Sequence, residues 1–229
     1  MRPHTTVPLS RLQVLNGRTM HDALQQSAQA TLHTDADAGP LVALRADRDV
    51  SIEAAVGRAT VSALRAHPHV NARVGVDGLI VHHAVNLGLM VVVEKGVVVP
   101  VVEGAEQLSL RDLDATFQRL TEQAETGRLS LNDTRNPTFT LASFADYGVD
   151  HFTPILVGSM VGTLGIGRVR AVCEPSEGGC RPGHRIALSL TFDHRAIHGV
   201  EAPGLADADA AQIAGAPRRH AHHEVLHEV

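Results

Sequence analysis

Two segments of the chain repeat apolar residues with the spacing of an amphipathic helix. Residues 51–66 begin at Ser51, a plausible N-cap, and end before Pro68. A second segment begins with an S-x-x-D start at Ser109 and ends at Gly127. The stripes that predict these helices are Ile52, Ala55, Val56, Ala59 and Leu64 in the first, and Leu110, Leu113, Phe117 and Leu120 in the second.

Residues 78–102 are instead rich in the β-branched residues that favour strands. Glu94-Lys95-Gly96 turns this segment into a hairpin whose strands are apolar on both faces. Such strands are covered on both sides or buried against another subunit, so we expect an interface here. Extended pieces are predicted near 138–143, 160–170 and 184–192, and a weaker helix over 202–214.

This alternation predicts an α/β fold of two layers, with helices packed on a mixed, largely antiparallel sheet. The 229 residues carry a formal charge of −5 and are 44% apolar, which fits one large domain or two small ones. Mild acidity and the absence of Trp argue against nucleic acid or an anionic membrane as partner. No apolar run reaches the ~20 residues of a membrane span and no signal-peptide core is visible, so we expect a cytoplasmic protein.

Some cysteines and histidines invite a chemical interpretation. Cys173 and Cys180 lie in a Gly/Pro-rich loop where a disulfide is geometrically possible. Without a secretion signal, we expect two reduced thiols. The histidines of the tail, 220–223, lack a rigid element, and the adjacent His82 and His83 face opposite ways on a strand. We expect no metal site at either place.

The segment 189–199 carries the strongest chemical signal. A strand over 186–192 delivers Asp193-His194-Arg195 to its end, and a Gly follows. A histidine at a strand end can reach a cleft from a rigid base, where a general base is useful. The alternative is an ordinary surface histidine beside an Asp and an Arg that pair with each other.

The same segment, D-H-R-A-I-H-G at 193–199, resembles the D-H-R-x-x-D-G signature of the acyltransferase component of 2-oxo acid dehydrogenase complexes. The wider family, including chloramphenicol acetyltransferase, shares the H-x-x-x-D-G core. Further stretches resemble the same catalytic domain in the same order, over roughly residues 7–215: V-P-L-S at 7–10, the hairpin of 83–101, T-F-T-L at 138–141, and residues 148–155 and 164–168. The resemblance implies a chloramphenicol acetyltransferase-like, trimer-forming fold.

The resemblance also implies a reaction, acyl transfer between the thiols of dihydrolipoamide and coenzyme A. His194 would take the thiol proton, since a thiol of pKa about 8.5 is mostly protonated at neutral pH. A family serine donates to the tetrahedral oxyanion across the interface between two subunits of a trimer. Such a donor contributes about 10²–10³ in rate. The chemistry requires no metal. The resemblance also implies a homotrimer, and family trimers often assemble into cubic or larger cages. Other subunits of a 2-oxo acid dehydrogenase complex would be its partners.

This chain departs from the family at two site positions. The serine aligns with Ala142, which cannot donate a hydrogen bond, and the aspartate of D-G aligns with His198. Ser143 is adjacent but points to the opposite face of a strand, unless a one-residue bulge brings it round. The candidate catalytic residues are therefore His194, Ser143 and His198, and no residue is assigned to coenzyme A.

We expect a single catalytic domain over 1–229, with a core at about 7–215 and a polar, His-rich tail at 216–229. Family members usually carry lipoyl and subunit-binding domains before this one; we expect neither here, so the lipoyl group would come from another chain. Three hypotheses remain: an active dihydrolipoyl acyltransferase, a free-standing acyltransferase with another small acceptor, and a scaffold paralogue that assembles without catalysing.

Overall fold

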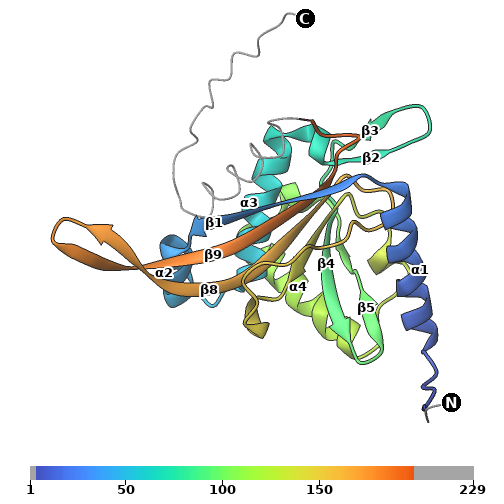
Figure 1. Ribbon diagram of the computed structural model, residues 1–229, viewed down its shortest axis with the longest axis horizontal. Helices are drawn as coiled ribbons and strands as arrows, with labels where there is room; N and C mark the ends of the chain where they lie inside the picture. The colour runs from blue at the N-terminus through green and yellow to red at the C-terminus, as the bar shows by residue number, and fades with distance from the viewer. Residues whose placement is uncertain (1–3, 199–229) are drawn as a thin grey trace, which may run out of the picture.

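A seven-stranded mixed sheet organises the computed structural model, which describes residues 4–198 (Figure 1). β7 is parallel to both of its neighbours, and the other pairs are antiparallel, as the sequence predicted. In spatial order the strands are β1 (Gln29–Asp37), β9 (Gly179–Asp193), β8 (Gly162–Ser176), β7 (Phe139–Ser143), β4 (Leu87–Val93) and β5 (Gly96–Val98), with β6 (Val101–Val102) also paired to β4.

The predicted helices are present and begin at the predicted serines. α3 (Ile52–Ala66) is capped by the Ser51 side chain, and α4 (Leu110–Glu125) by that of Ser109. Gly127 adopts a left-handed φ of 66° just beyond α4, where an L side chain would be strained. Two further helices, α1 (Arg11–Gln26) and α2 (Gly39–Asp47), were not predicted from the sequence.

The predicted hairpin of residues 78–102 is confirmed only in part. β4 and β5 form it through the turn at Glu94-Lys95, with Val93 opposite Gly96. Residues 79–81 belong elsewhere, because β3 (Leu79–Val81) pairs with β2 (Ala72–Val74) in a separate ribbon. Val92 of β4 is 46% exposed in the single chain, so one face of this hairpin remains uncovered.

The hydrophobic core lies between the sheet and helices α3 and α4. Phe139 and Leu141 of β7 point into it and are fully buried. Gly57 lets α3 approach closely, since a Cβ there would lie 3.2 Å from the Leu141 side chain. On the other face of the sheet, Phe152 lies over Gly165 of β8, where a Cβ would come within 2.9 Å of the ring. One face of the sheet therefore carries the helices, and the segment containing Phe152 covers part of the other.

β8 and β9 extend beyond the body of the fold as a two-stranded arm (Figure 1). The expectation of reduced thiols in a loop is wrong, because Cys173 and Cys180 lie on these strands and are joined by a disulfide. The antiparallel register brings their Cα atoms to 5.5 Å, a separation that suits a disulfide. Glu174 on the arm pairs with Arg181 and Arg185.

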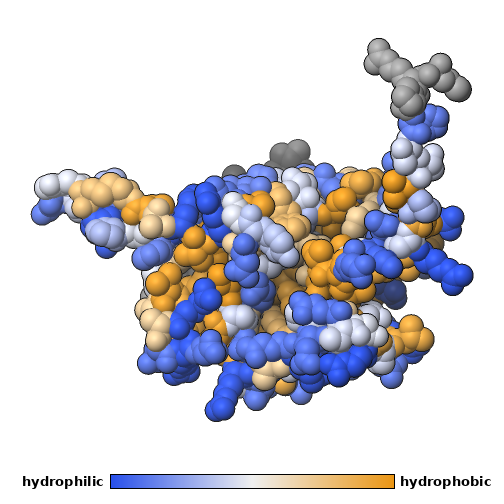
Figure 2. Space-filling model, turned by 90° about the horizontal axis from the view of Figure 1, so that it is seen from below, coloured by the Kyte–Doolittle hydropathy of each residue, from blue (hydrophilic) through white to orange (hydrophobic). Residues whose placement is uncertain are grey.

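Within residues 4–198, no helix combines the length and apolar character needed to cross a membrane. The helix predicted over 202–214 and the histidines at 220–223 lie outside the described residues. Figure 2 shows the molecule from below, with hydrophobic surface on either side of a hollow.

Candidate active site

His194 lies on a turn that directly follows β9. Its backbone N–H donates to the carbonyl of Ala28 at 2.8 Å, and the N–H of Ile197 donates to the carbonyl of Asp193 at 3.1 Å. Ile197 is fully buried in the core, so both ends of the turn are anchored. The backbone therefore fixes the position of His194, as the sequence hypothesis of a histidine on a rigid base required.

The imidazole of His194 is exposed and has aromatic neighbours. The ring centroids of Phe192 and His198 each lie 5.8 Å from that of His194. His198 is exposed as well, so the structure brings these two candidate residues together at one surface. The His194 ring is accessible to a substrate from solvent.

Asp193 is buried and is held by Arg195. Its carboxylate accepts hydrogen bonds from the Arg195 guanidinium, the closest at 2.6 Å, and from the backbone N–H groups of Arg195 and Ala28. Burial raises the pKa of Asp193, but these hydrogen bonds outweigh it and hold the pKa below its ordinary value. The Asp–Arg pair suggested by the sequence does form. Its contacts brace the turn and leave the imidazole of His194 facing outward.

Ala142 and Ser143 face opposite sides of β7. Leu141 points into the helix-side core, so Ala142, only 2% exposed, lies on the other face. Ser143 points back to the helix side and donates to the Glu53 carboxylate at 2.6 Å. β7 keeps a continuous register through Ser143, so the bulge that would turn this side chain round is not found there. The register shift in this sheet lies in β8 instead, between Ile166 and Val169.

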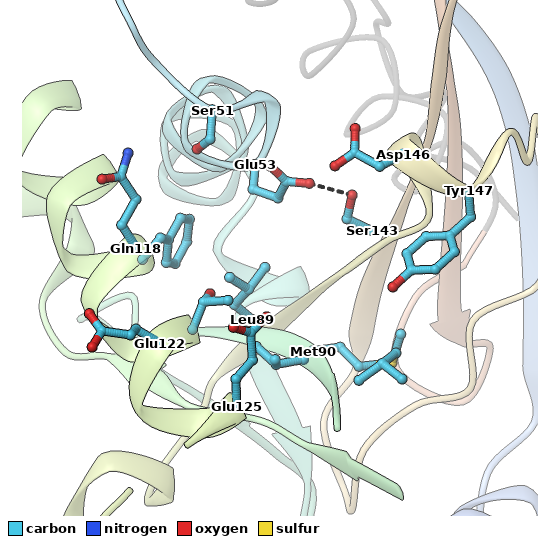
Figure 3. Close-up of a pocket in the computed structure, with 14 residues that line it drawn as sticks. Ser51, Glu53, Leu89, Met90, Gln118, Glu122, Glu125, Ser143, Asp146 and Tyr147 are labelled. Atoms are coloured by element: carbon cyan, nitrogen blue, oxygen red, sulfur yellow. Dashed lines mark hydrogen bonds between the residues drawn. The ribbon is translucent and has the colours of Figure 1, made fainter. Parts of the chain in front are cut away.

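A pocket of about 430 Å³ opens where β7 ends, between α3, α4 and β4 (Figure 3). Tyr147, the last residue of the short 3-10 helix η4 (Ala145–Tyr147), lines it together with Ser143. Its apolar lining is Leu89, Met90, Val91, Val92 and Phe117, and its carboxylates are Glu53, Glu122, Glu125 and Asp146. None of the described lining residues is Lys or Arg, so the pocket lacks cations for the phosphates of a nucleotide.

His194 and position 142 lie far apart within one chain. Ala142 pairs with Gly165 on the neighbouring strand β8, and Gly165 pairs with Ser189 on β9. Ser189 therefore lies two strands away from Ala142 at the same level of the sheet. His194 follows Ser189 by five residues, about 16 Å along the strand, and two strand spacings add about 10 Å sideways. The direct separation is therefore about 19 Å. A site that combines both positions needs a second copy of the chain.

A family model, 2-oxoacid dehydrogenases acyltransferase (catalytic domain), matches residues 1–212. The chain belongs to this family. The dihydrolipoyllysine-residue acetyltransferase component of the acetoin cleaving system of Bacillus subtilis is 34% identical over 206 residues, 86% of this chain and 52% of that protein. The succinyltransferase component of the 2-oxoglutarate dehydrogenase complex of Rickettsia bellii is 32% identical with the same coverage. The acyltransferase domain described here thus spans about half the length of these relatives.

Solved structures place the acyltransferase domain in the same fold. The dihydrolipoamide acetyltransferase of Azotobacter vinelandii superposes with a TM-score of 0.87 at 25% identity, covering 93% of this chain and 92% of that one. The cubic core of a pyruvate dehydrogenase complex gives the same TM-score and coverage at 26% identity. Chloramphenicol acetyltransferase, at a TM-score of 0.55, 11% identity and coverages of 86% and 94%, shares the fold. The predicted fold family is confirmed.

The Azotobacter enzyme was studied for the roles of a serine, a histidine and an asparagine in its catalytic mechanism. There the serine precedes the histidine by 52 positions and the asparagine follows it by four. In this acyltransferase domain Ala142 precedes His194 by the same 52 positions, and His198 follows by four. Ala142 and His198 thus stand at the same spacings from His194 as the serine and the asparagine from the histidine of that enzyme.

The sequence interpretation missed two pocket residues, Glu53 and Tyr147. Glu53 is an acidic residue in the first turn of α3, which by itself indicates only a favourable helix start. Its partner Ser143 is 90 residues away, so only the folded chain reveals the pair. Among the residues that the structure describes, no group of three or more His, Cys, Asp or Glu side chains is arranged to hold a metal ion.

Proposed function

We propose that this domain transfers an acyl group between the thiol of coenzyme A and a dihydrolipoyl thiol, with His194 as the general base. The observation that carries the proposal is the exposed imidazole on a turn anchored by its backbone. The relatives named above are acetyltransferase and succinyltransferase components for a dihydrolipoyllysine residue. Shared family membership supports the same reaction class here.

The proposed reaction begins with the acceptor thiol. A thiol has a pKa of about 8.5, so His194 accelerates the step by accepting its proton as the sulfur attacks the thioester carbonyl. The new carbon–sulfur bond forms a tetrahedral oxyanion. That intermediate collapses, the bond to the departing sulfur breaks, and the imidazolium returns the proton to the departing thiolate. Atoms and charge balance without any further reactant.

The site is proposed to be shared between copies of the chain. The separation of about 19 Å between His194 and position 142 prevents the two from meeting within one molecule. A trimer, as the family resemblance implies, would bring His194 of one copy to position 142 of the next. A cubic core is described for a related pyruvate dehydrogenase complex, which supports a larger assembly as an extension of this trimer.

The two thiol substrates are proposed to come from outside the described chain. The lipoyl group would be carried by another polypeptide or another region, and coenzyme A would bind as a substrate. The acidic pocket beside Ser143 does not suit coenzyme A phosphates, because none of its described lining residues is a cation. No residue is assigned to the nucleotide.

The direct test is acyl transfer from a panel of acyl-coenzyme A thioesters to free dihydrolipoamide. His194→Ala should lower kcat by about 10²–10⁴, the usual contribution of a general base. His21→Ala, at an exposed histidine on α1, is the matched control and should retain the wild-type rate. Equal rates in wild type and His194→Ala would remove His194 from the mechanism. A monomer in sedimentation at micromolar concentration would refute the shared site.

A scaffold role is the second candidate, and Ala142 favours it because this position has no hydrogen-bond donor. A scaffold predicts stable assembly without coenzyme A binding. Isothermal titration calorimetry separates the two functions: micromolar binding of coenzyme A supports the enzyme. No binding and no turnover from a folded oligomer support the scaffold.

A further inference from the structure

The reaction proposed above requires a hydrogen bond to the oxyanion, and neither residue predicted for that position supplies one. Ala142 has only a methyl group, and it is buried on the face of β7 away from the helices. Ser143 carries a hydroxyl, but it donates to Glu53 on the opposite face. We therefore looked for another side-chain donor that reaches the open end of β7.

Tyr147 reaches this place from the short helix η4, four residues after Ser143. It is the only tyrosine of the chain, and the residue is 69% exposed. Its backbone N–H donates to the carbonyl of Phe144 at 3.1 Å, and Gly148 follows with a left-handed φ of 73°. This tight turn reverses the chain and directs the phenol ring back over the pocket.

A row of aromatic rings connects Tyr147 with the surroundings of Ala142. The Tyr147 ring packs edge-on against Phe144 with centroids 5.7 Å apart, and Phe144 packs on Phe152 at 4.8 Å. Phe152 lies over Gly165, the register partner of Ala142 on β8. The ring of Tyr147 is thus held at the edge of the surface on which Ala142 lies.

The other neighbour of Ala142 lies in the same pocket as the phenol. Met90 of β4 is the register partner of Ala142, and Met90, Ser143 and Tyr147 all line the pocket. Figure 3 shows the Tyr147 hydroxyl directed into the pocket, on the side where Met90 lies, while Ser143 turns away toward Glu53. The Tyr147 hydroxyl therefore faces the end of the pair formed by β4 and β7, where Met90 and Ala142 lie side by side.

We propose that the Tyr147 hydroxyl donates the hydrogen bond to the oxyanion that Ala142 cannot donate. This inference rests on the proposed acyl transfer. The phenol O–H of tyrosine is a hydrogen-bond donor that can point at an oxyanion. It gains and loses no proton, and the bond strengthens as charge develops on the carbonyl oxygen. His194 of a second copy accepts the proton of the thiol that attacks the carbonyl carbon of the same thioester.

The experiment compares four proteins in the thioester-to-dihydrolipoamide assay: wild type, Tyr147→Phe, Ala142→Ser, and the double variant. Tyr147→Phe removes one oxygen atom from an exposed ring, so an unchanged melting temperature verifies folding. Loss of an oxyanion donor should lower kcat about 10²-fold and leave KM within a few fold, because the contact forms only in the transition state. Ala142→Ser in the Tyr147→Phe background should restore at least part of this loss.

Ser143→Ala is the competing variant, since it removes the other hydroxyl near this strand end. A wild-type kcat in Tyr147→Phe overturns the inference and leaves the proposed function standing. A fall in kcat in Ser143→Ala, with none in Tyr147→Phe, assigns the role to Ser143 instead. No turnover in the wild-type protein with any thioester overturns the acyl-transfer proposal and this inference together. Loss of activity that Ala142→Ser does not recover at all shows that the Tyr147 hydroxyl acts elsewhere than on the oxyanion and also overturns the donor role.

Discussion

Arg195 is the residue whose removal tests how the turn of His194 is held. The Asp193 side chain is 2% exposed and that of Arg195 is 48% exposed. Breaking a buried ion pair costs about 3–5 kcal/mol, but solvent screens this half-exposed guanidinium, and two backbone N–H groups still reach the carboxylate. Arg195→Ala should therefore lower the free energy of unfolding by about 2 kcal/mol at neutral pH.

The pH dependence gives this prediction a second, independent readout. The pKa of Asp193 is held low in the folded wild type, so the pair contributes stability above the unfolded pKa. That contribution is lost as the pH falls through the folded value. Without the Arg195 guanidinium, only the two backbone N–H groups still lower the pKa of the buried carboxylate, so the folded pKa lies closer to the unfolded one. The stability difference between wild type and Arg195→Ala should therefore be largest near neutrality and shrink below about pH 4.

The assay is urea unfolding followed by far-ultraviolet circular dichroism, because the chain has no Trp and one Tyr. Protein concentration is kept fixed, since assembly would couple stability to concentration. Arg128→Ala is the matched control: Arg128 pairs with Glu122 at 2.7 Å, but the two side chains are 61% and 70% exposed. It should cost no more than about 0.5 kcal/mol. Equal losses in the two variants, or a gap that does not change between pH 7 and pH 3, would refute the reasoning.

Further predictions concern the backbone and the arm. Gly167→Ala should cost more than about 3 kcal/mol or prevent folding, because the new methyl group would overlap the backbone of Asp150. Gly17→Ala in α1 is its control, since nothing lies within 4 Å of the new atom. Because Ala favours a helix more than Gly does, this variant should be about 0.5–1 kcal/mol more stable and melt at a higher temperature. Replacing Cys173 and Cys180 with Ser should speed amide hydrogen exchange in the arm and leave the core melting transition nearly unchanged, because both residues are exposed. A loss of several degrees in that transition would contradict this placement.

How far the sequence predicts the fold depends on whether a signal is local. α3 and α4 were predictable because each combines a capping serine with an apolar stripe. The sequence interpretation missed α1, although Ser10 and Gln13 form a capping box at its start; only Ala23 of this helix is buried in the single chain. The disulfide depends on the register of two strands whose residues near the tip are polar, and a short-range pattern cannot give that register.

The candidate site divides in the same way. Strand alternation correctly predicted that Ser143 and Ala142 face opposite sides, and a motif identified His194. The contact of Ser143 with Glu53 and the position of Tyr147 over the pocket depend on tertiary packing of segments far apart in the chain. Sequence therefore predicted which way these strand residues face, but not which residues they contact.

The distance between His194 and position 142 has a consequence for mixed assemblies. If each site takes its base from one chain and its oxyanion donor from the next, two differently damaged chains can complement each other. A chain without His194 still offers an intact donor surface, and a chain damaged at that surface still offers its histidine. Assembled together, such chains would create some complete sites, although each alone would be inactive. Activity would then depend on the composition of the assembly, and a defective chain would act on its neighbours' sites as well as on its own.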